Sequence, residues 1–76
     1  MSELEWLDIF ADNLRDIMQE RRMTQNVLAV ESGINQSCIS RYLTKKQMPT
    51  VKAIVNLSYA LRCDIRDLID FGDMIE

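Results

Sequence analysis

Polar side chains able to hydrogen-bond to a flat ligand recur between residues 36 and 44 of this 76-residue chain. At about 100° per residue, a helix through this segment has a polar arc of roughly 140°. That arc holds an amide, a guanidinium and three hydroxyls: Gln36, Ser37, Ser40, Arg41 and Thr44. The opposite arc is mostly apolar: Cys38, Ile39, Tyr42 and Leu43. One side would anchor the helix, and the other would be free to bind.

The polar arc carries side-chain types that fit the edges of nucleic-acid bases. A glutamine amide pairs with adenine, an arginine fork pairs with guanine, and a serine can reach a base or a phosphate at close range. The short side chains would let the helix approach its ligand closely. The alternative is an ordinary exposed helix face of moderate polarity, and this segment alone leaves both interpretations open.

The formal net charge is −3, and the charges are unevenly distributed. Residues 1–20 carry six acids and one arginine, a balance of −5. Residues 21–52 carry six cations and one acid, a balance of +5, and residues 53–76 carry five acids and two arginines, a balance of −3. A polyanion would be attracted to the middle third and repelled by both ends. The alternative is that the charges merely segregate among solvated helix faces.

Composition disfavours several classes of function. Histidine, the commonest general base and metal ligand, is absent, so we expect no enzyme, no cofactor and no metal site. We expect Cys38 and Cys63 to be reduced thiols, because Glu3, Glu5 and Asp8 stand where an export signal needs positive charge. No apolar run approaches the length of a membrane span. These features favour a soluble, cytoplasmic protein without a membrane partner.

Length and composition favour a single all-α domain over residues 1–76. Only two glycines and one proline occur, too few for the turns of a many-stranded β fold. Helical periodicity predicts helices at about 3–22, 25–31, 36–43 and 51–61, and a last short helix after residue 64. Each follows a good N-cap residue: Ser2, Thr24, Asn35, Thr50 and Asp64. Arg21 and Arg22 would lie in the last turn of the first helix.

Apolar positions at helical spacing predict the core. In the first helix they are Leu4, Leu7, Phe10, Ala11, Leu14, Ile17 and Met18. In the fourth they are Val51, Ile54, Leu57, Ala60 and Leu61. The short second helix would bury Leu28 and Ala29, and the last one Ile65, Leu68 and Ile69. Gly33 permits a left-handed exit from the second helix, and the short connection that follows favours a steep crossing with the third.

A series of short motifs runs through this helix pair: Thr24-Gln25, Leu28-Ala29, Ser32-Gly33-Ile34, Asn35-Gln36-Ser37 and Ile39-Ser40-Arg41. The series resembles the Cro/repressor-like helix-turn-helix family, which includes phage repressors and many bacterial regulators. With Pro49-Thr50 and the apolar pattern after it, the resemblance covers about residues 10 to 70. It implies a compact five-helix, lambda-repressor-like DNA-binding domain. Residues 24–43 would form the helix-turn-helix, and the recognition helix, residues 36–43, would enter the major groove.

Carried over by position, the resemblance implies roles for individual residues. The base readers would be Gln36, Ser37 and Arg41, with Ser40 nearby. Four further residues match positions that contact the DNA backbone in relatives: Gln25, Thr44, Lys46 and Gln47. Gln25 also matches the residue that often braces the first glutamine of the recognition helix, here Gln36.

The chain departs from the family pattern at five positions. Lys45 and Arg62 stand where many relatives have glycine after a helix, so each takes a left-handed conformation or ends its helix differently. Val27, Val30 and Leu43 stand where many relatives have polar or acidic residues. These three could be exposed and contact a protein partner, or local repacking of the core could absorb them.

The resemblance implies a bacterial or phage transcriptional regulator, a repressor that occupies a promoter-region operator. One helix reads only a few base pairs, so we expect a homodimer on a palindromic double-stranded DNA site. The candidate dimer residues are Phe71, Met74 and Ile75, with Tyr59 and Trp6. The alternatives are a restriction-modification controller, an antitoxin-type regulator, and a protein-interaction module that has lost DNA binding.

Overall fold

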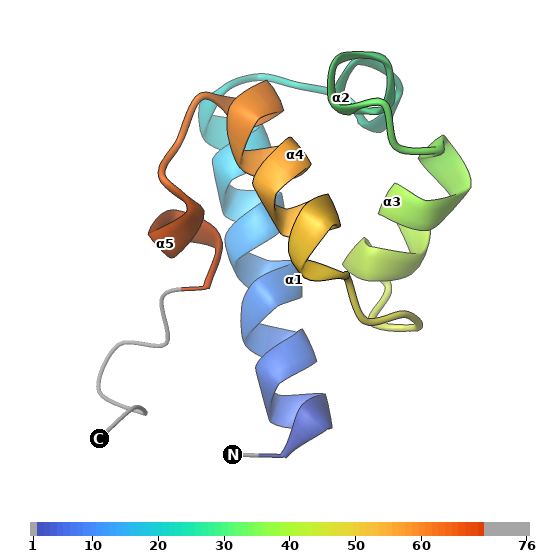
Figure 1. The fold of residues 1–76 in the computed structure, drawn as a ribbon, viewed down its shortest axis with the longest axis vertical. Coiled ribbons are helices and arrows are strands. Elements are labelled where there is room, and N and C mark those ends of the chain that lie inside the picture. Colours follow the sequence, from blue (N-terminus) through green and yellow to red (C-terminus); the bar gives the residue numbers. More distant parts are fainter. Residues whose placement is uncertain (1, 70–76) are drawn as a thin grey trace.

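Five helices, joined by short turns and loops, form the part of the chain that the computed structural model describes, residues 2–69 (Figure 1). They are α1 (Glu3–Glu20), α2 (Gln25–Ser32), α3 (Gln36–Leu43), α4 (Val51–Leu61) and α5 (Ile65–Leu68). No strand occurs in these residues. The prediction of an all-α fold is confirmed.

The five helices begin where the sequence predicts. Each predicted N-cap side chain accepts a hydrogen bond from a backbone N–H of the turn that follows: Ser2, Thr24, Asn35, Thr50 and Asp64. At α5 the cap is reciprocal, because Asp67 Oδ2 accepts from the backbone N–H of Asp64 at 3.1 Å. These bonds satisfy N–H groups that a helix start otherwise leaves without partners.

The first helix is shorter than predicted. It ends at Glu20, with Arg21 as its C-cap, so both arginines lie beyond its last turn. Arg22 has a φ of 54°, in the left-handed region, and the N–H of Met23 donates back to the carbonyl of Met18 at 2.9 Å. This closing bond replaces the next helical one and turns the chain toward α2. Side-chain periodicity does not report such a backbone reversal.

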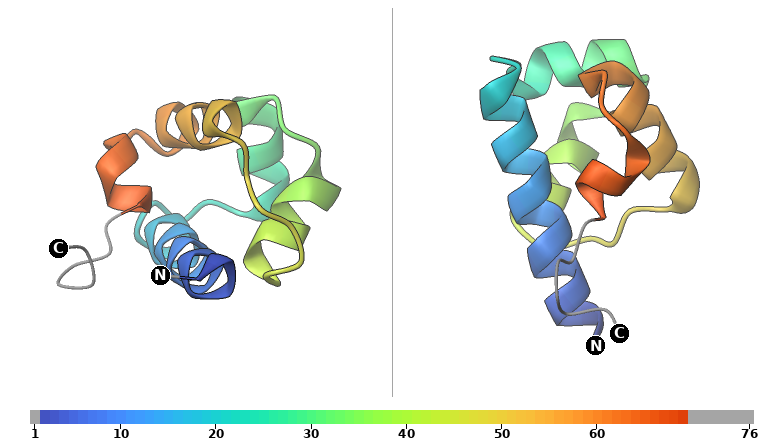
Figure 2. Two further views of the ribbon diagram at one scale, coloured as in Figure 1. Left: turned by 60° about the horizontal axis from the view of Figure 1, so that its bottom comes forward. Right: turned by 90° about the vertical axis from the view of Figure 1, so that its left-hand side faces the viewer.

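The helices pack as a closed ring around the core. Their main contacts follow the order α1, α3, α2, α4, α5 and back to α1. Figure 2 (left) shows this arrangement, with α1 and α4 on opposite sides. The large side chains sealed inside come from all five helices: Phe10, Leu14, Leu28, Ile39, Leu57, Leu61 and Leu68. Helix α3 is thus one wall of the core.

Two predicted core residues are exposed. Leu4 and Val51 each keep 75% of their accessible surface. Both lie in the first turn of a helix, and the lower end of α1 extends beyond the other helices (Figure 1). Periodicity identifies a helix face but not where the neighbouring element stops covering it. Trp6, in contrast, is partly buried, and its ring stacks on Phe10 with centroids 5.7 Å apart.

Polar side chains of α1 and of its C-cap hold the ends of three other helices. Arg15 Nη2 donates to the carbonyl of Leu43 at 3.0 Å, at the end of α3. Arg21 Nε donates to the carbonyl of Leu61 at 3.1 Å, at the end of α4, and Asn13 donates to Leu68 at the end of α5. Helix C-termini carry unpaired carbonyls and a partial negative charge, so amide and guanidinium donors stabilise them.

The exits of α3 and α4 are left-handed although neither has a glycine. Lys45 has a φ of 63° and Arg62 a φ of 57°. The N–H of the next residue then donates to a carbonyl five positions back, from Lys46 to Arg41 at 2.8 Å and from Cys63 to Ser58 at 3.0 Å. Both helices therefore end as they would with glycine, at a steric cost that a glycine would avoid.

None of the helices within residues 2–69 combines the length and the apolar character needed to cross a membrane.

We expect Arg15→Ala to lower the free energy of unfolding by about 1 kcal/mol, because the carbonyl of Leu43 loses a charged donor. Urea denaturation followed by circular dichroism measures this change. The matched control is Arg66→Ala, which removes only a bond to the exposed carboxylate of Asp64 and should change stability little. Equal losses in the two variants would contradict a specific role for the bond at the end of α3.

Candidate nucleic-acid interface

A tight turn joins α2 to α3. Gly33 has a φ of 72° and ends α2, and its N–H donates to the carbonyl of Ala29 at 3.0 Å. Two residues later, Asn35 Oδ1 accepts from the N–H of Ser37 at 2.8 Å and starts α3. Left-handed backbone is readily available to glycine, so the chain reverses without strain. The two helices cross steeply (Figure 1), as the short connection predicts.

Packing of its apolar side fixes the rotation of α3 about its own axis. Ile39 is fully buried, and Tyr42 and Leu43 nearly so. The Tyr42 ring meets Phe10 of α1 edge-on, with centroids 6.1 Å apart, and burial raises the pKa of its phenol. With these residues inside, the opposite side of α3 must face outward. The apolar arc predicted from the sequence is the anchored side.

The outward side of α3 brings the predicted base readers together. Gln36, Ser37 and Arg41 are exposed, and Ser40 is half-buried. Together with Gln25 of α2 they line a shallow hollow of about 440 Å³. Gln25, predicted to work beside Gln36, therefore lies on the same surface although it belongs to another helix. We call this surface, formed by these five residues, the recognition surface.

Arg41 is held by two neighbours. Its Nε donates to Gln47 Oε1 at 2.6 Å, and its Nη2 contacts Cys38 Sγ at 3.2 Å. Sequence reasoning missed both contacts. The three-residue spacing of Cys38 and Arg41 places them side by side on a helix and could have indicated one of them. The path of the loop that returns Gln47 to α3 has no such signal.

The remaining predicted backbone contacts lie at the end of α3 and in the loop after it. Thr44 is exposed, and its hydroxyl donates to the carbonyl of Ser40 at 2.8 Å. Lys46 is exposed, and Gln47 is half-buried against Arg41. These side chains follow the recognition surface along the chain, whereas Gln25, the fourth predicted backbone contact, is part of that surface.

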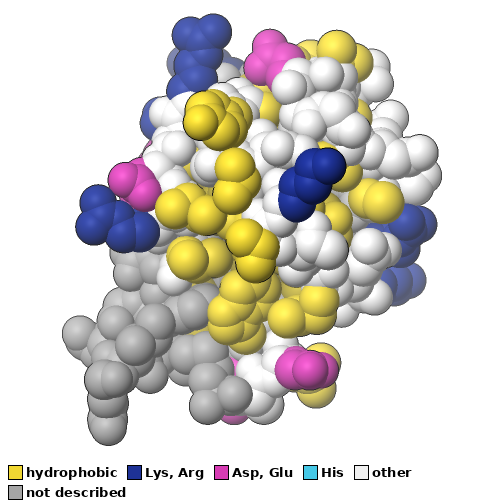
Figure 3. All heavy atoms as spheres, viewed as in Figure 1, with side chains coloured by type: hydrophobic (Ala, Val, Ile, Leu, Met, Phe, Trp, Pro, Cys, Tyr) yellow, Lys and Arg dark blue, Asp and Glu magenta, His cyan; other side chains and the backbone are white. Residues whose placement is uncertain are grey.

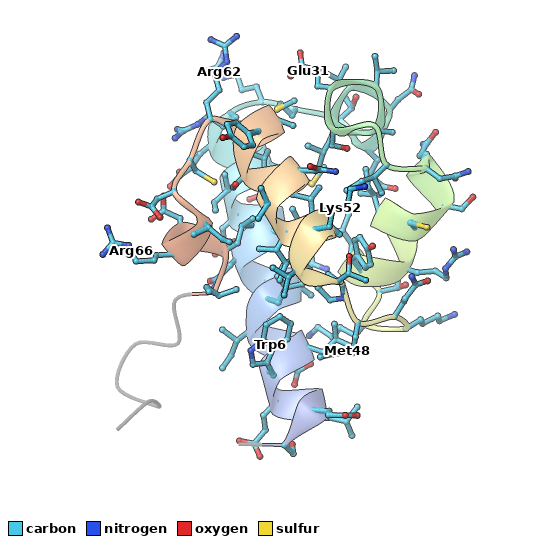
Figure 4. All side chains as sticks on the ribbon, viewed as in Figure 1. Trp6, Glu31, Met48, Lys52, Arg62 and Arg66 are labelled. Atoms are coloured by element: carbon cyan, nitrogen blue, oxygen red, sulfur yellow. The ribbon has the colours of Figure 1, made fainter. Side chains whose placement is uncertain are left out.

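The basic middle third of the sequence is not one patch in space. Lys45 Nζ lies 3.0 Å from Asp8 of α1, and this hydrogen bond raises the pKa of the lysine. Arg21 is bound to the end of α4. Lys52 lies on the face of α4 (Figure 4), whereas Arg41 lines the recognition surface and Lys46 follows α3 in the chain. In Figure 3 the dark blue group over α4, where Figure 4 labels Lys52, stands apart from the dark blue groups on the α3 side of the view.

Of the three apolar residues that depart from the family pattern, two are exposed and one is absorbed into the core. Val27 and Val30 of α2 keep 45% and 78% of their surface, but Leu43 keeps only 8%. Leu43 lies on the anchored side of α3 and belongs to the core. A protein contact on this part of the domain could therefore use the two valines only.

Neither cysteine forms a disulfide. Cys38 lies at the edge of the polar arc, and Cys63 packs against the core, where burial raises the pKa of its thiol. Within residues 2–69, the acidic and thiol side chains form no group of three that could hold a metal ion.

Comparison with protein families decides the identity of this fold. A sequence model of the Cro/C1-type HTH DNA-binding domain matches residues 13–73. The chain belongs to this family. The resemblance seen in the sequence is confirmed, and the matched residues include α2, the turn after it and α3. The domain is that of a DNA-binding regulator, and its family is one of DNA-binding domains and not of enzymes.

A solved structure supports the same fold. The crystal structure of the restriction-modification controller protein C.AhdI from Aeromonas hydrophila is similar to the Cro/C1-type domain with a TM-score of 0.79. The two sequences are 26% identical, and the match covers 82% of this chain and 94% of the other. No curated protein sequence gives a significant match.

We expect Asn35→Ala to lower the free energy of unfolding by about 1 kcal/mol, because α3 loses its N-cap. Asn35→Asp is the matched control, since aspartate caps helices about as well, and it should retain most of the stability. Thermal and urea denaturation of the three proteins measure the difference. An Asn35→Ala variant as stable as the parent would show that the cap contributes nothing to holding the Cro/C1-type recognition helix.

Proposed function

We propose that this domain is a sequence-specific repressor of bacterial or phage transcription that occupies a promoter-region operator. In this proposal, α3 lies in the major groove of double-stranded DNA. The observation that carries it is the fixed rotation of α3: burial of Ile39 and Tyr42 turns the amide, hydroxyls and guanidinium outward. Because the ligand would be DNA in the bacterial cell, we expect the protein to act in the cytoplasm. The proposed repressor role requires no catalysis and no cofactor.

Base recognition is assigned to the outward side chains of α3. Gln36 can donate to and accept from an adenine, and Arg41 can donate two parallel hydrogen bonds to a guanine. Ser37 and Ser40 are short, so the helix can approach the floor of the groove while their hydroxyls reach a base or a phosphate. The shallow hollow that these side chains share with Gln25 supports the assignment.

Backbone contacts are assigned to Gln25, Thr44, Lys46 and Gln47. Lys46 is exposed and supplies a cation for a phosphate. The hydroxyl hydrogen of Thr44 is donated to the carbonyl of Ser40, so it must turn away from α3 before it can donate to a phosphate. Acids on α1, in contrast, would repel DNA from that side of the domain, and this asymmetry favours the proposed orientation.

We expect a homodimer, because one recognition helix reads too few base pairs to define a site. Two copies would present their α3 helices to half-sites about 34 Å apart. The outer face of α4 supports a contact with a second copy: Val51, Val55 and Tyr59 are spaced by four residues, and Tyr59 is 80% exposed. Hydrophobic side chains cluster over α4 in Figure 3, on a different side of the domain from α3.

The predicted dimer residues fall in two groups. Tyr59 and Trp6 lie within the described part of the chain, and Trp6 is only partly exposed at the lower end of α1 (Figure 4). Phe71, Met74 and Ile75 lie outside the described residues. We therefore assign the testable part of the dimer surface to α4.

A more specific role is control of a restriction-modification system. The similarity to a restriction-modification controller protein over most of both chains favours it. Such a role would use the same recognition surface and the same symmetric DNA site. A restriction-modification gene pair beside the gene for this protein would support it, and an unrelated gene neighbourhood would count against it.

A role in protein binding without DNA affinity is favoured by the exposed Val27 and Val30. The salt dependence of binding distinguishes DNA binding from protein binding. Binding to phosphates weakens steeply between low and physiological salt, whereas an apolar contact between proteins does not.

The proposed function is tested by selecting bound sequences from a random pool of duplex DNA. We expect an enriched palindrome whose half-sites are about one helical turn apart. Failure to enrich any sequence, together with an absence of binding at low salt, would contradict sequence-specific DNA binding.

We expect Arg41→Ala to weaken binding to the selected site by about 1–3 kcal/mol and to relax the preference at one base pair of each half-site. Lys46→Ala should weaken binding to selected and random DNA alike, because a phosphate carries no sequence information. Fluorescence anisotropy titrations with both DNAs measure the two effects. Equal effects of the two substitutions on both DNAs would contradict the assigned roles.

We expect Tyr59→Glu to shift the dimer toward monomer, because a carboxylate would be buried against the second copy. The matched control is Val30→Glu, a change at an equally exposed apolar residue on α2. Sedimentation at micromolar concentration, with and without the selected DNA, measures the oligomeric state. A parent protein that remains a monomer in both conditions would contradict the dimer, and dissociation only in Val30→Glu would place the contact on α2.

A further inference from the structure

The guanidinium of Arg41 is fixed along one of its edges before any ligand is present. Nε donates to Gln47 Oε1 at 2.6 Å, and Nη2 contacts Cys38 Sγ at 3.2 Å. These two nitrogens form the same side of the planar group. The side chain is otherwise exposed, so without these contacts it would sample many rotamers.

We propose that Gln47 is a positioning residue for Arg41. Its carboxamide oxygen, together with the sulfur of Cys38, holds the Nε–Nη2 edge and leaves the Nη1–Nη2 edge to read a guanine. This inference rests on the proposed function and deepens it, because it assigns Gln47 a part in sequence specificity in addition to its expected contact with the DNA backbone.

The N–H donors of Arg41 that remain free match the acceptors of a guanine. A guanidinium has five N–H donors, and the two contacts use one on Nε and one on Nη2. Both hydrogens of Nη1 and one of Nη2 remain, and one from each nitrogen points outward along the adjoining Nη1–Nη2 edge. That edge presents the two parallel donors that pair with O6 and N7 of guanine. Holding the Nε–Nη2 edge therefore reduces the conformational entropy that the arginine loses on binding, and it leaves both donors of the Nη1–Nη2 edge available.

The fold brings Gln47 to this position. After α3, Lys45 takes a left-handed conformation, and the N–H of Lys46 donates to the carbonyl of Arg41 at 2.8 Å. Lys45 Nζ is bound to Asp8 of α1 at 3.0 Å, which ties the start of the loop to the body of the domain. The chain is thereby turned back along α3, and Gln47 lies beside a residue six positions earlier.

The same amide can join the two kinds of DNA contact. Its oxygen accepts from Arg41, and its Nε2 keeps two N–H donors that can bind a phosphate oxygen. A phosphate that binds Gln47 would fix the amide, and the amide would fix the arginine. The phosphate contact of Gln47, which carries no sequence information, would then support the guanine contact of Arg41, which does.

The experiment compares two DNAs and three proteins. The DNAs are the selected operator and the same operator with 7-deazaguanine at the guanine whose preference Arg41→Ala abolishes. The proteins are the full chain as parent, Gln47→Ala and Gln47→Glu. Fluorescence anisotropy gives the ratio of the two dissociation constants for each protein, and this ratio measures guanine discrimination apart from overall affinity.

We expect Gln47→Ala to reduce the discrimination ratio by about threefold to tenfold, the effect of losing one orienting hydrogen bond. Gln47→Glu keeps an oxygen acceptor and should retain the ratio. It should weaken binding to both DNAs, because its carboxylate faces phosphates. Adding Gln47→Ala to an Arg41→Ala background should cause no further loss of discrimination, since the residue acts through Arg41.

Lys46→Ala is the matched control in the same loop and should leave the ratio unchanged while lowering both affinities. An unchanged ratio in Gln47→Ala, with the parent still discriminating, would overturn the positioning role and leave the proposed function intact. If both Gln47→Ala and Gln47→Glu lose guanine discrimination, an oxygen acceptor at this position is not sufficient, and the assignment of the positioning role to Gln47 Oε1 is overturned. A parent protein that shows no sequence preference would overturn the proposed function itself, and this inference with it.

Discussion

The burial of one side of α3 is the constraint on which the recognition surface depends. Ile39 and Tyr42 are inserted into a core that all five helices share, and the Tyr42 ring packs edge-on against Phe10 of α1. A helix anchored in this way cannot rotate without exposing those side chains, which costs hydrophobic free energy. The polar side is therefore presented at a fixed angle. Any reading of base edges requires this rigidity, because hydrogen bonds tolerate only small errors in distance and angle.

Polar contacts from α1 and from its C-cap Arg21 fix the ends of helices whose inward sides are set by the apolar core. The core is non-directional and sets only which sides of the helices face inward. The bonds from Asn13, Arg15 and Arg21 to the last carbonyls of α5, α3 and α4 are directional and fix where those helices end. The Lys45–Asp8 pair does the same for the loop after α3. The acidic, net-negative helix thus has a structural part in a DNA-binding domain even though it would repel DNA itself.

The distribution of charge favours a defined orientation of the domain on DNA more than it favours a high affinity for DNA. Two cations of the basic middle third are taken up by contacts within the domain, Lys45 with α1 and Arg21 with α4. Arg41 and Lys46 remain at and beside the recognition surface, with neutral donors around them. In the proposed DNA complex, correct placement of these few side chains would accompany the general attraction to phosphates.

Local sequence determined the helices, their N-caps, the left-handed turn at Gly33 and the two-sided character of α3, because each depends on neighbours within a few residues. The family resemblance added the prediction of a helix-turn-helix. It also predicted that Gln36, Ser37, Ser40 and Arg41 act together with Gln25. Only the tertiary structure decided between exposure and burial for Val27, Val30 and Leu43, left Leu4 and Val51 exposed, and divided the basic block. It also decided that Gln47 meets Arg41. These outcomes depend on which segments distant in the chain come to cover one another, and no local pattern of residues encodes that.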